Sequence, residues 1–426
     1  MSRFLVLTLI AYSLLLAGIV TLHGDMLALS IPFALYLLVG YLRGPENVQL
    51  EAPRHLSAER VVPNSEVTIT VTVTNRGSDL EEVLLEDIAS PTLTIRDGSA
   101  RHLLRLASGK SYAFTYTVSG PRGGYAFESV WAQINDHLAV TGRKVKIDAR
   151  GELFVFPLIT RLRHVAIRPR RTRVYAGNIP AKVGGAGAEF FGVREYQIGD
   201  PPRMINWRAS ARHEETLYAN EYQQERVSDI GIVLDGRLRT NVFARGHSIF
   251  EYSVQAAAAL ADAFLTQGNR VSLLVYASFL QWTLPGYSKI QRERILHSLA
   301  HAEPGGSDVF SGLEHIPTRL FPPHSQVVLV SPLVEDDLNP LVQLRARGYQ
   351  VMVISPDPVT FELSYLPRER SVDLAARVVR MERMLLLQKI QRAGVQVLDW
   401  NVTHPFDQVV QRKLSRPPAW LRAIGR

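Results

Sequence analysis

The segment DIGIVLD at 229–235 decides the fold of the C-terminal half of the chain. It is a short apolar run between two aspartates, and such a run is typical of a strand buried on both faces of a sheet. Similar strands are predicted at 270–276, 326–330, 349–355 and 395–400. Helical stretches separate them, at 248–267, 291–301, 337–347 and 372–393. This alternation predicts a doubly wound parallel α/β domain over residues 229–403, followed by a C-terminal tail at 404–426.

Residues 46–150 are predicted to form an antiparallel β-sandwich. The segment EVTITVTVTN at 66–75 alternates apolar side chains with threonine, which is typical of a half-buried strand. Further short strands are predicted at 80–87, 102–106, 111–119 and 125–135. Short strands separated by turn residues favour a sandwich over a parallel sheet.

Two apolar runs at the N-terminus predict a transmembrane helix hairpin over residues 1–45. The runs cover 4–22 and 26–42, and each approaches the roughly 20 residues that a helix needs to cross a bilayer. A cleaved signal peptide fits less well, because a second apolar run follows the first at once. Arginines flank the hairpin on its outer sides only. The positive-inside bias therefore predicts a multi-pass protein of the cytoplasmic membrane, with its soluble domains in the cytoplasm.

Composition excludes cysteine chemistry and leaves the partners of a basic chain open. The 426 residues include no cysteine, so disulfides, thiolate metal sites and cysteine nucleophiles are excluded. The formal net charge is +8, and the densest basic run is RLRHVAIRPRRTR at 161–173. Because no aromatic side chains are interleaved there, we expect no nucleic-acid partner. A solvated surface is favoured for this run over contact with membrane lipid.

Residues 151–228 are predicted to be a linker that contains the segment EFFGVREYQIGDPPRMINWRASARHEETLYANEY at 189–222. Gly199 allows a tight turn, Asp200 is placed to cap a helix, and Pro201 suits a first helical position.

Four residues separate Arg203 from Trp207, so on one helix the guanidinium and the indole would share a face and could stack. The segment is interpreted in two ways. It is either an internal clamp that fixes the linker to the α/β domain or a recognition surface with arginine and tryptophan anchors. The residues alone favour the clamp slightly and leave both open.

This segment resembles the signature of the DUF58 family of uncharacterised bacterial and archaeal proteins. The matching positions are Arg194, Tyr196, Gly199, Asp200, Arg203, Ile205, Trp207, Ala209, Ala211, Arg212 and Glu221. The resemblance implies an N-terminal helix pair, a sandwich and a von Willebrand factor A-like domain. It also implies a partner, because such proteins are typically encoded beside MoxR-type AAA+ ATPases and are thought to act with them in assembling or maturing protein complexes.

Many von Willebrand factor A domains bind Mg²⁺ through an Asp-x-Ser-x-Ser strand end, a threonine from a second loop and an aspartate from a third. Here the first element is 235-DGRLR-239, so Arg237 and Arg239 replace both serines. The second loop offers Ser307 and Asp308, and the third offers Ser331 followed by proline. Arginine cannot ligate a metal and would repel one, so we predict no metal and no cofactor. Either arginine could instead pair with Asp235 or with an acidic partner, or point into solvent.

The sequence therefore predicts a membrane-anchored protein-binding scaffold that is not an enzyme. The predicted partner surface lies at the strand ends and comprises Asp235, Arg237, Arg239, Ser307, Asp308 and Ser331. No nucleophile elbow, zinc-protease helix or Walker loop occurs. Two alternatives stay open. One is a membrane-tethered hydrolase, which a pocket joining His213 to a strand-end carboxylate would favour. The other is an extracellular adhesion module, which needs the opposite topology.

Overall fold

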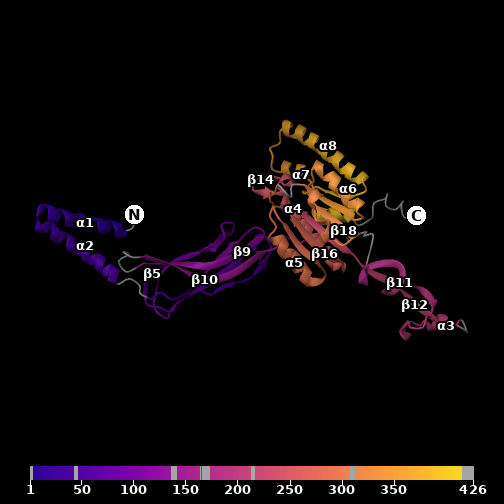
Figure 1. The fold of residues 1–426 in the computed structure, drawn as a ribbon, viewed down its shortest axis with the longest axis horizontal. Helices are drawn as coiled ribbons and strands as arrows, with labels where there is room; N and C mark the ends of the chain where they lie inside the picture. The colour runs from indigo at the N-terminus through magenta and orange to yellow at the C-terminus, as the bar shows by residue number, and fades with distance from the viewer. Residues whose placement is uncertain are drawn as a thin grey trace. The chain divides into compact units, whose positions relative to one another are not determined.

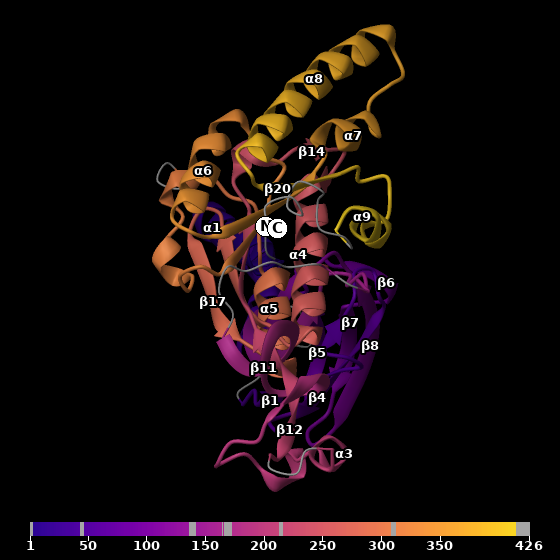
Figure 2. The same ribbon diagram turned by 90° about the vertical axis from the view of Figure 1, so that its right-hand side faces the viewer.

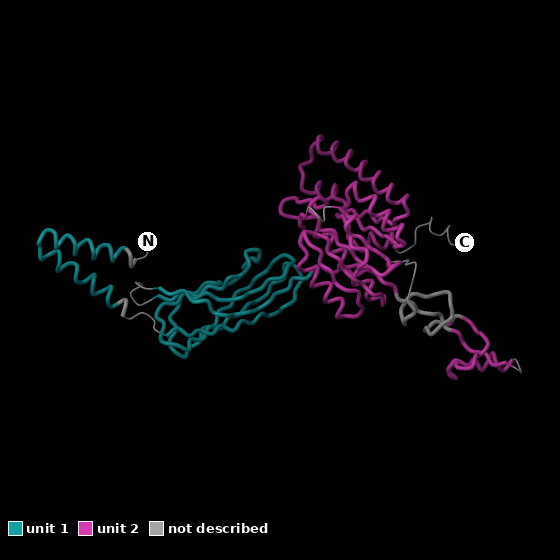
Figure 3. The backbone as a smooth tube through the Cα atoms, in the orientation of Figure 1, with its two compact units in different colours: residues 1–156 teal, residues 157–426 magenta. Residues whose placement is uncertain are grey.

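The structure is a computed structural model that describes residues 3–42, 47–135, 142–163, 165, 173–212, 216–307 and 312–414. The chain divides into two compact units, residues 1–156 and 157–426, which are coloured separately in Figure 3. Figure 1 gives the order of the helices and strands along the chain.

Two helices of 19 residues open the first unit, α1 (Arg3–Thr21) and α2 (Gly24–Leu42). The chain reverses between them at Leu22, which has a φ of +52°. The two helices lie side by side as a hairpin (Figure 1).

In the described part of the chain, no helix is both long enough and apolar enough to cross a membrane. This finding overturns the predicted transmembrane spans at 4–22 and 26–42, and with them the fold class as predicted and the multi-pass location in the cytoplasmic membrane. A span needs about 20 predominantly apolar residues. Both runs fall short of that length, and Gly24 and Asp25 take up the first turn of α2.

The remainder of the first unit consists of two five-stranded sheets. The first has the order β1-β4-β8-β6, with β2 paired to β4. Its strands are β1 (Leu50–Glu51), β2 (Arg54–Leu56), β4 (Val67–Asn75), β6 (Thr94–Gly98) and β8 (Ser111–Ser119). The second has the order β3-β10-β9-β5-β7, in which only the β3–β10 pair is parallel. Its strands are β3 (Arg60–Val61), β5 (Leu80–Asp87), β7 (Arg101–Leu106), β9 (Gly123–Asn135) and β10 (Gly142–Val155).

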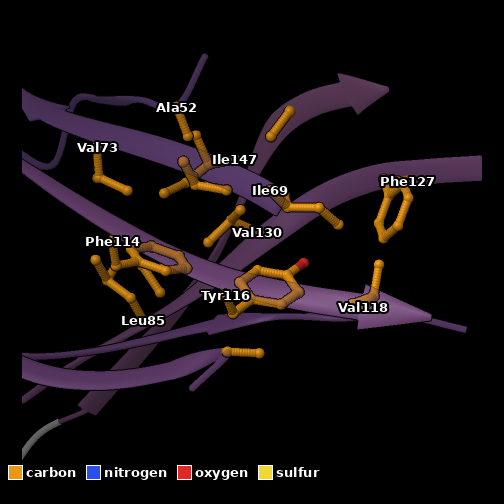
Figure 4. Close-up of a cluster of buried hydrophobic side chains, with 14 of the residues drawn as sticks. Ala52, Ile69, Val73, Leu85, Phe114, Tyr116, Val118, Phe127, Val130 and Ile147 are labelled. Carbon is orange, nitrogen blue, oxygen red and sulfur yellow. The ribbon is translucent and has the colours of Figure 1, made fainter. Parts of the chain in front are cut away.

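The core of this unit lies between its two sheets. Along β4 every second side chain is buried, from Val67 to Val73, while the intervening threonines are only partly covered. Figure 4 shows Ile69 and Val73 of β4 in one cluster with Phe114 and Tyr116 of β8 and Val130 of β9. The alternation of apolar residues and threonines in the sequence therefore corresponds to the alternation of buried and partly covered side chains along β4.

A polar group is buried inside this apolar core. The Arg54 guanidinium donates hydrogen bonds to Asp87 and to the carbonyl oxygen of Ala149, and both charged side chains are fully covered. The Tyr116 hydroxyl donates to Asp87 Oδ2 over 2.7 Å. Burial raises the pKa of Asp87, although the nearby Arg54 charge opposes the rise. Such a group is tolerated inside a core because its two opposite charges are paired with each other.

The second unit begins with a two-stranded antiparallel ribbon formed by β11 (Arg173–Glu195) and β12 (Tyr218–Val227). Between these strands lie the 3₁₀ helix η1 (Pro202–Met204) and the short helix α3 (Trp207–Ser210).

A six-stranded sheet forms the centre of the second unit, in the order β17-β16-β13-β18-β19-β20. All neighbours are parallel except β17. The strands are β13 (Asp229–Asp235), β16 (Arg270–Tyr276), β17 (Leu280–Gly286), β18 (Gln326–Val330), β19 (Gln350–Pro356) and β20 (Gln396–Trp400). The predicted strands at 229–235, 270–276 and 326–330 have the observed bounds, whereas β17 was not predicted.

Helices lie on both faces of this sheet (Figure 2). The helices α4 (Ile249–Thr266) and α5 (Ser288–Ala300) pack on one face, and α6 (Leu338–Ala346) and α8 (Arg370–Arg392) pack on the other. Shorter elements complete the domain: η2 (Leu238–Thr240), β14 (Phe243–Ala244), β15 (His247–Ser248), η3 (Leu313–His315), η4 (Thr318–Leu320), η5 (Glu335–Asp337), α7 (Pro358–Leu363) and α9 (Phe406–Lys413).

The strand order reverses direction between β13 and β18, because β16 and β17 extend the sheet to one side and β18 to β20 extend it to the other. Open α/β sheets bind their ligands beside such a switch point, at the carboxyl ends of the strands. The carboxyl ends of β13 and β18 are therefore where a site is expected.

We expect the substitution Asp87→Leu to lower the free energy of unfolding by roughly 3–5 kcal/mol, because it leaves the Arg54 guanidinium buried without its carboxylate. The double substitution Arg54→Met, Asp87→Leu should lose less, since no charge stays buried. Urea unfolding followed by circular dichroism measures both. A double variant that is less stable than the single one would contradict this account.

Candidate functional site

The switch point of the sheet is occupied by side chains of the chain itself. β13 ends at Asp235, whose carboxylate is fully covered, and Ser331 follows directly after β18. The Ser331 hydroxyl donates a hydrogen bond of 2.6 Å to Asp235 Oδ2. The two adjacent strand ends are thereby joined at their polar side chains.

Arg237 folds back onto Asp235 from two residues further on. Its Nε donates to Oδ1 and its Nη2 donates to Oδ2, both over 2.8 Å. Its backbone N–H also donates to Oδ1, over 3.0 Å. The contact is therefore bidentate, the geometry in which a guanidinium and a carboxylate bind most strongly.

The same guanidinium binds a second carboxylate one hundred residues away. Nη1 and Nη2 of Arg237 donate to Oδ1 and Oδ2 of Asp337, both over 2.9 Å. Asp337 closes η5 and accepts a further hydrogen bond from the backbone N–H of Val334. We call Asp235, Arg237, Ser331 and Asp337 the buried arginine cluster, since its three charged side chains are at most 2% exposed.

Electrostatics favour a permanent positive charge at the centre of this cluster. Burial disfavours the charged form of Arg237, but the hydrogen bonds and charges of Asp235 and Asp337 outweigh that cost and raise its pKa. Burial also raises the pKa of Asp337, and the adjacent Arg237 opposes this rise. The cluster is therefore held by charge-assisted hydrogen bonds in a region of low dielectric.

Backbone contacts fix the loop that carries Arg237. The N–H of Gly236 donates to the carbonyl of Tyr276, and the N–H of Gly305 donates to the carbonyl of Gly236, both over 2.8 Å. The Thr240 hydroxyl donates to the carbonyl of Arg237 over 2.9 Å. The loop is tied to two neighbouring segments and cannot swing outward without breaking these bonds.

The residues of the cluster do not fit a divalent cation. Mg²⁺ needs oxygen ligands around it at about 2.1 Å, and arginine offers only donors. The guanidinium lies where the two carboxylates would converge on an ion. Among the described residues, no group of three or more His, Asp or Glu side chains is arranged to hold a metal. The cluster offers a fixed internal cation in place of an exchangeable one.

The remaining residues of the predicted partner surface do not join this cluster. Arg239 is exposed and pairs with the exposed Asp336 over 2.6 Å. Ser307 lies at the end of a described segment, and Asp308 lies outside the described residues. Because Asp235, Arg237 and Ser331 are buried, the six predicted residues do not form one exposed surface.

Two residues of the strand-end region escaped sequence reasoning. The sequence pattern places Asp337 at the start of a helix, although the three consecutive acidic residues at 335–337 are a usable signal for a buried carboxylate. Arg383 of α8 donates to Asp399 Oδ1 over 2.7 Å and to the Ser355 hydroxyl over 2.9 Å, and its Nε lies 3.3 Å from Asp357. This second arginine covers the carboxyl ends of β19 and β20.

We call the contacts among Arg194, Tyr196, Asp200 and Glu221 the clamp; they lie within the ribbon, whereas the clamp predicted from the sequence joins it to the α/β domain. Nη1 and Nη2 of Arg194 each donate to a carboxylate oxygen of Asp200 over 2.7 Å, and its Nε lies 3.7 Å from Glu221 of β12. The Tyr196 hydroxyl donates to the carbonyl of Asp200. The hydrogen bond from Arg194 lowers the pKa of Asp200. Gly199 lies in this turn with a φ of +111°, a conformation that favours glycine.

Two local predictions for the signature were wrong. Asp200 caps no helix, because its carboxylate accepts from Arg194 and from the Gln197 N–H. Arg203 and Trp207 do not share a helix, since η1 ends at Met204 and α3 begins at Trp207. The cap of α3 is Asn206, whose side chain accepts from the Ala209 N–H over 2.9 Å.

The segment between the two ribbon strands presents apolar and basic side chains to solvent. We call residues 196–217 the ribbon tip, of which 213–215, including His213, lie outside the described residues. Ile198 is fully exposed and Trp207 is 68% exposed. Arg203, Arg208 and Arg212 are exposed as well. The clamp thus uses residues of the ribbon itself, and a different set of signature residues faces outward.

The fold and the cluster define the class: an α/β domain whose switch point is closed by arginine, preceded by a ribbon that carries the signature segment. Comparison with known proteins finds a matching family. Residues 192–375 match the family described as "Protein of unknown function DUF58". These residues therefore carry a DUF58 domain, as the signature segment predicted.

A relative that matches most of the chain and several solved structures were also found. The chain is 24% identical over 378 residues to the uncharacterised protein YeaD of Bacillus subtilis, covering 85% of this chain and 88% of that protein. A CARDB domain from Pyrococcus furiosus matches 26% of this chain and 90% of its own, at 15% identity and a TM-score of 0.18. Proximal thread matrix protein 1 of the mussel byssus matches 44% of this chain and 47% of its own, at 14% identity and a TM-score of 0.26. Scores this low do not establish a shared fold.

We expect Arg237→Met to lower the free energy of unfolding by roughly 3–5 kcal/mol, because it leaves two carboxylates buried without their common partner. The matched control is Arg239→Met, which removes a solvent-exposed pair and should cost only about 0–1 kcal/mol. Chemical denaturation of both variants measures the difference. Equal losses of unfolding free energy in the two variants would show that the buried ion pairs stabilise the fold no more than the exposed one.

Tyr276 makes the stability of this region depend on pH in the alkaline range. Its buried hydroxyl donates to the carbonyl of Gly312, and burial raises its pKa from 10.0 to about 12. The unfolded chain loses this proton first, so the contribution to stability is complete below pH 10 and is lost as the pH rises toward 12. Unfolding of the wild type and of Tyr276→Phe across this window should show a steeper fall for the wild type. Parallel curves would contradict the burial of this hydroxyl.

Proposed function

We propose that this protein is a protein-binding scaffold, not an enzyme, that acts with a MoxR-type AAA+ ATPase in the assembly or maturation of protein complexes. It binds its partner without a metal ion. The scaffold role rests on the buried arginine cluster and on the exposed ribbon tip, and the choice of partner rests on the family resemblance.

The observation that carries the proposal is the position of the Arg237 guanidinium. It fills the switch point of the sheet, where a ligand of an open α/β domain would otherwise lie, and it is held on two sides by Asp235 and Asp337. Arg383 covers the neighbouring strand ends in the same way. A small substrate entering there would have to displace a charged side chain from its paired carboxylates.

The ribbon tip supplies the binding surface of the proposal. Tryptophan and arginine are the residues that most often dominate the energy of protein interfaces. Trp207 projects from a helix that is capped by Asn206 and anchored to β12 by the hydrogen bond from Asn206 to Asn220. The Arg194–Asp200 clamp holds the adjoining turn. A surface fixed in this way loses little conformational entropy on binding.

Charge suits the tip to an acidic surface. Arg203, Arg208 and Arg212 are exposed beside Trp207, whereas the acidic Asp200 and Glu221 are engaged with Arg194. Arginines that surround an apolar anchor steer an acidic partner and fix its orientation.

The test is direct binding between the purified chain and a purified MoxR-type ATPase, measured by calorimetry or biolayer interferometry. Trp207→Ala should weaken binding about thirtyfold, which corresponds to roughly 2 kcal/mol for an interface hot spot. The matched control is Phe279→Ala, which removes an aromatic side chain that is 76% exposed elsewhere in the second unit. It should leave the affinity unchanged.

Two results would contradict the proposal. The first is a wild-type chain that does not bind the ATPase in any nucleotide state. The second is an equal loss for Trp207→Ala and Phe279→Ala, which would remove the ribbon tip from the interface. If EDTA abolishes binding in the absence of nucleotide, the claim that the partner is bound without a metal ion is wrong, and the rest of the proposal is unaffected.

A further inference from the structure

The helix α8 presents apolar side chains on two opposite faces. One face packs on the α/β domain through Ala376, Leu387 and Ile390, and it also carries the strand-end Arg383. Figure 2 shows α8 along the outer side of that domain. Such a helix normally needs only one apolar face, with polar residues opposite.

The second apolar face is exposed. We call Leu374, Val378, Met381 and Leu385 the α8 stripe; these side chains are 53%, 58%, 61% and 52% exposed. Their spacing of four, three and four residues places them on one line along the helix. At about 100° per residue this line lies opposite Ala376, Leu387 and Ile390. The stripe therefore points away from the domain that holds the helix.

The spacing of the stripe is that of a coiled-coil seam. In heptad notation Val378 and Leu385 take position a, and Leu374 and Met381 take position d. Among parallel coiled coils, branched valine at a with leucine at d, as at Val378 and Leu374, favours two strands over three or four. Two heptads alone would be a marginal coiled coil, but α8 is already folded on its domain, so pairing does not have to form the helix.

The flanking charges select the partner and its direction. Arg377 takes position g and Glu382 takes position e of the next heptad, and both are exposed. In a parallel pair, g of one helix faces this e of the other, so Arg377 would meet Glu382 of the partner subunit twice by symmetry. In an antiparallel pair g faces g and e faces e, so Arg377 would not meet Glu382 of the partner subunit.

From this pattern we propose that the α8 stripe is the dimerisation surface of this protein, pairing in parallel with α8 of a second copy of the chain. The two-fold axis runs along the helix pair. Val378 and Met381 form the central layers, and two symmetric ion pairs between Arg377 and Glu382 fix the register.

Sedimentation equilibrium of the full chain over a range of concentrations tests the dimer. The wild type should sediment as a dimer, and Val378→Glu should sediment as a monomer, because two carboxylates would meet in the seam. Circular dichroism verifies that this surface variant stays folded. A wild type that remains monomeric at the highest soluble concentration overturns the proposal.

A charge swap tests the register. Arg377→Glu and Glu382→Arg should each weaken dimerisation about tenfold, because each turns two attractive pairs into repulsive ones. The double variant Arg377→Glu, Glu382→Arg should restore the wild-type affinity. The matched control is Arg380→Glu, an equal change of charge at an exposed position off the seam, and it should have little effect. Failure of the double variant to recover overturns the proposed pairing.

Cysteine cross-linking tests the direction, and the chain suits it because it contains no cysteine of its own. In a parallel pair Val378 lies opposite Val378 of the partner subunit, so Val378→Cys should form a covalent dimer on mild oxidation. The exposed control Arg380→Cys should not. Equal cross-linking at both positions, or association only with lipid vesicles or another protein, overturns the parallel homodimer.

Discussion

The contact of one buried guanidinium with two carboxylates is the constraint on which the carboxyl edge of the α/β sheet depends. Removing charged groups from water costs several kcal/mol each, and this cost is met only when every partner is in place. Asp235 is placed by β13, Asp337 by η5, and Ser331 by the end of β18. The cluster therefore forms only when three separate segments meet at one point. Its main effect is to fix the relative positions of these segments, because the cost of burying the charges offsets most of the free energy gained from pairing them.

The same principle recurs at two other places in the chain. In the first unit Arg54 and Asp87 lie inside an apolar core, and in the ribbon Arg194 joins a turn to β12 through Asp200 and Glu221. In each case an arginine with its planar set of donors joins segments that hydrophobic contact alone would leave free to slide. The polar residues that hold the ribbon tip are thus distinct from the apolar and basic residues that it exposes.

The sequence predicted the parts of the fold that follow from local patterns. Strands buried on both faces of a sheet are continuously apolar, and this pattern predicted the bounds of β13, β16 and β18. A strand buried on one face alternates apolar and polar residues, and the threonine alternation predicted β4 in this way. The edge strand β17, which is only partly buried, left no such trace. The N-terminal runs were judged by apolar content alone, and the described helices do not meet the requirements for crossing a membrane.

The site could be predicted only in part, for a physical reason. Replacement of both serines by arginine was visible in the sequence and argued against a metal, and pairing of Arg237 with Asp235 was one of the options considered. Burial of that pair was not foreseeable, since arginine is usually exposed. Asp337 supplies the second carboxylate from one hundred residues away, and only the arrangement of β13 beside β18 brings it there.

That separation has a consequence for how the second unit folds. Contacts between residues far apart along the chain form only after the intervening segment has been ordered, and the associated loss of chain entropy slows their formation. β16, which pairs with β13 early in the chain order, can dock while Arg237 still faces water. The guanidinium can be enclosed only after β18 and η5 have arrived. Burial of this one side chain is therefore coupled to a contact of high sequence separation.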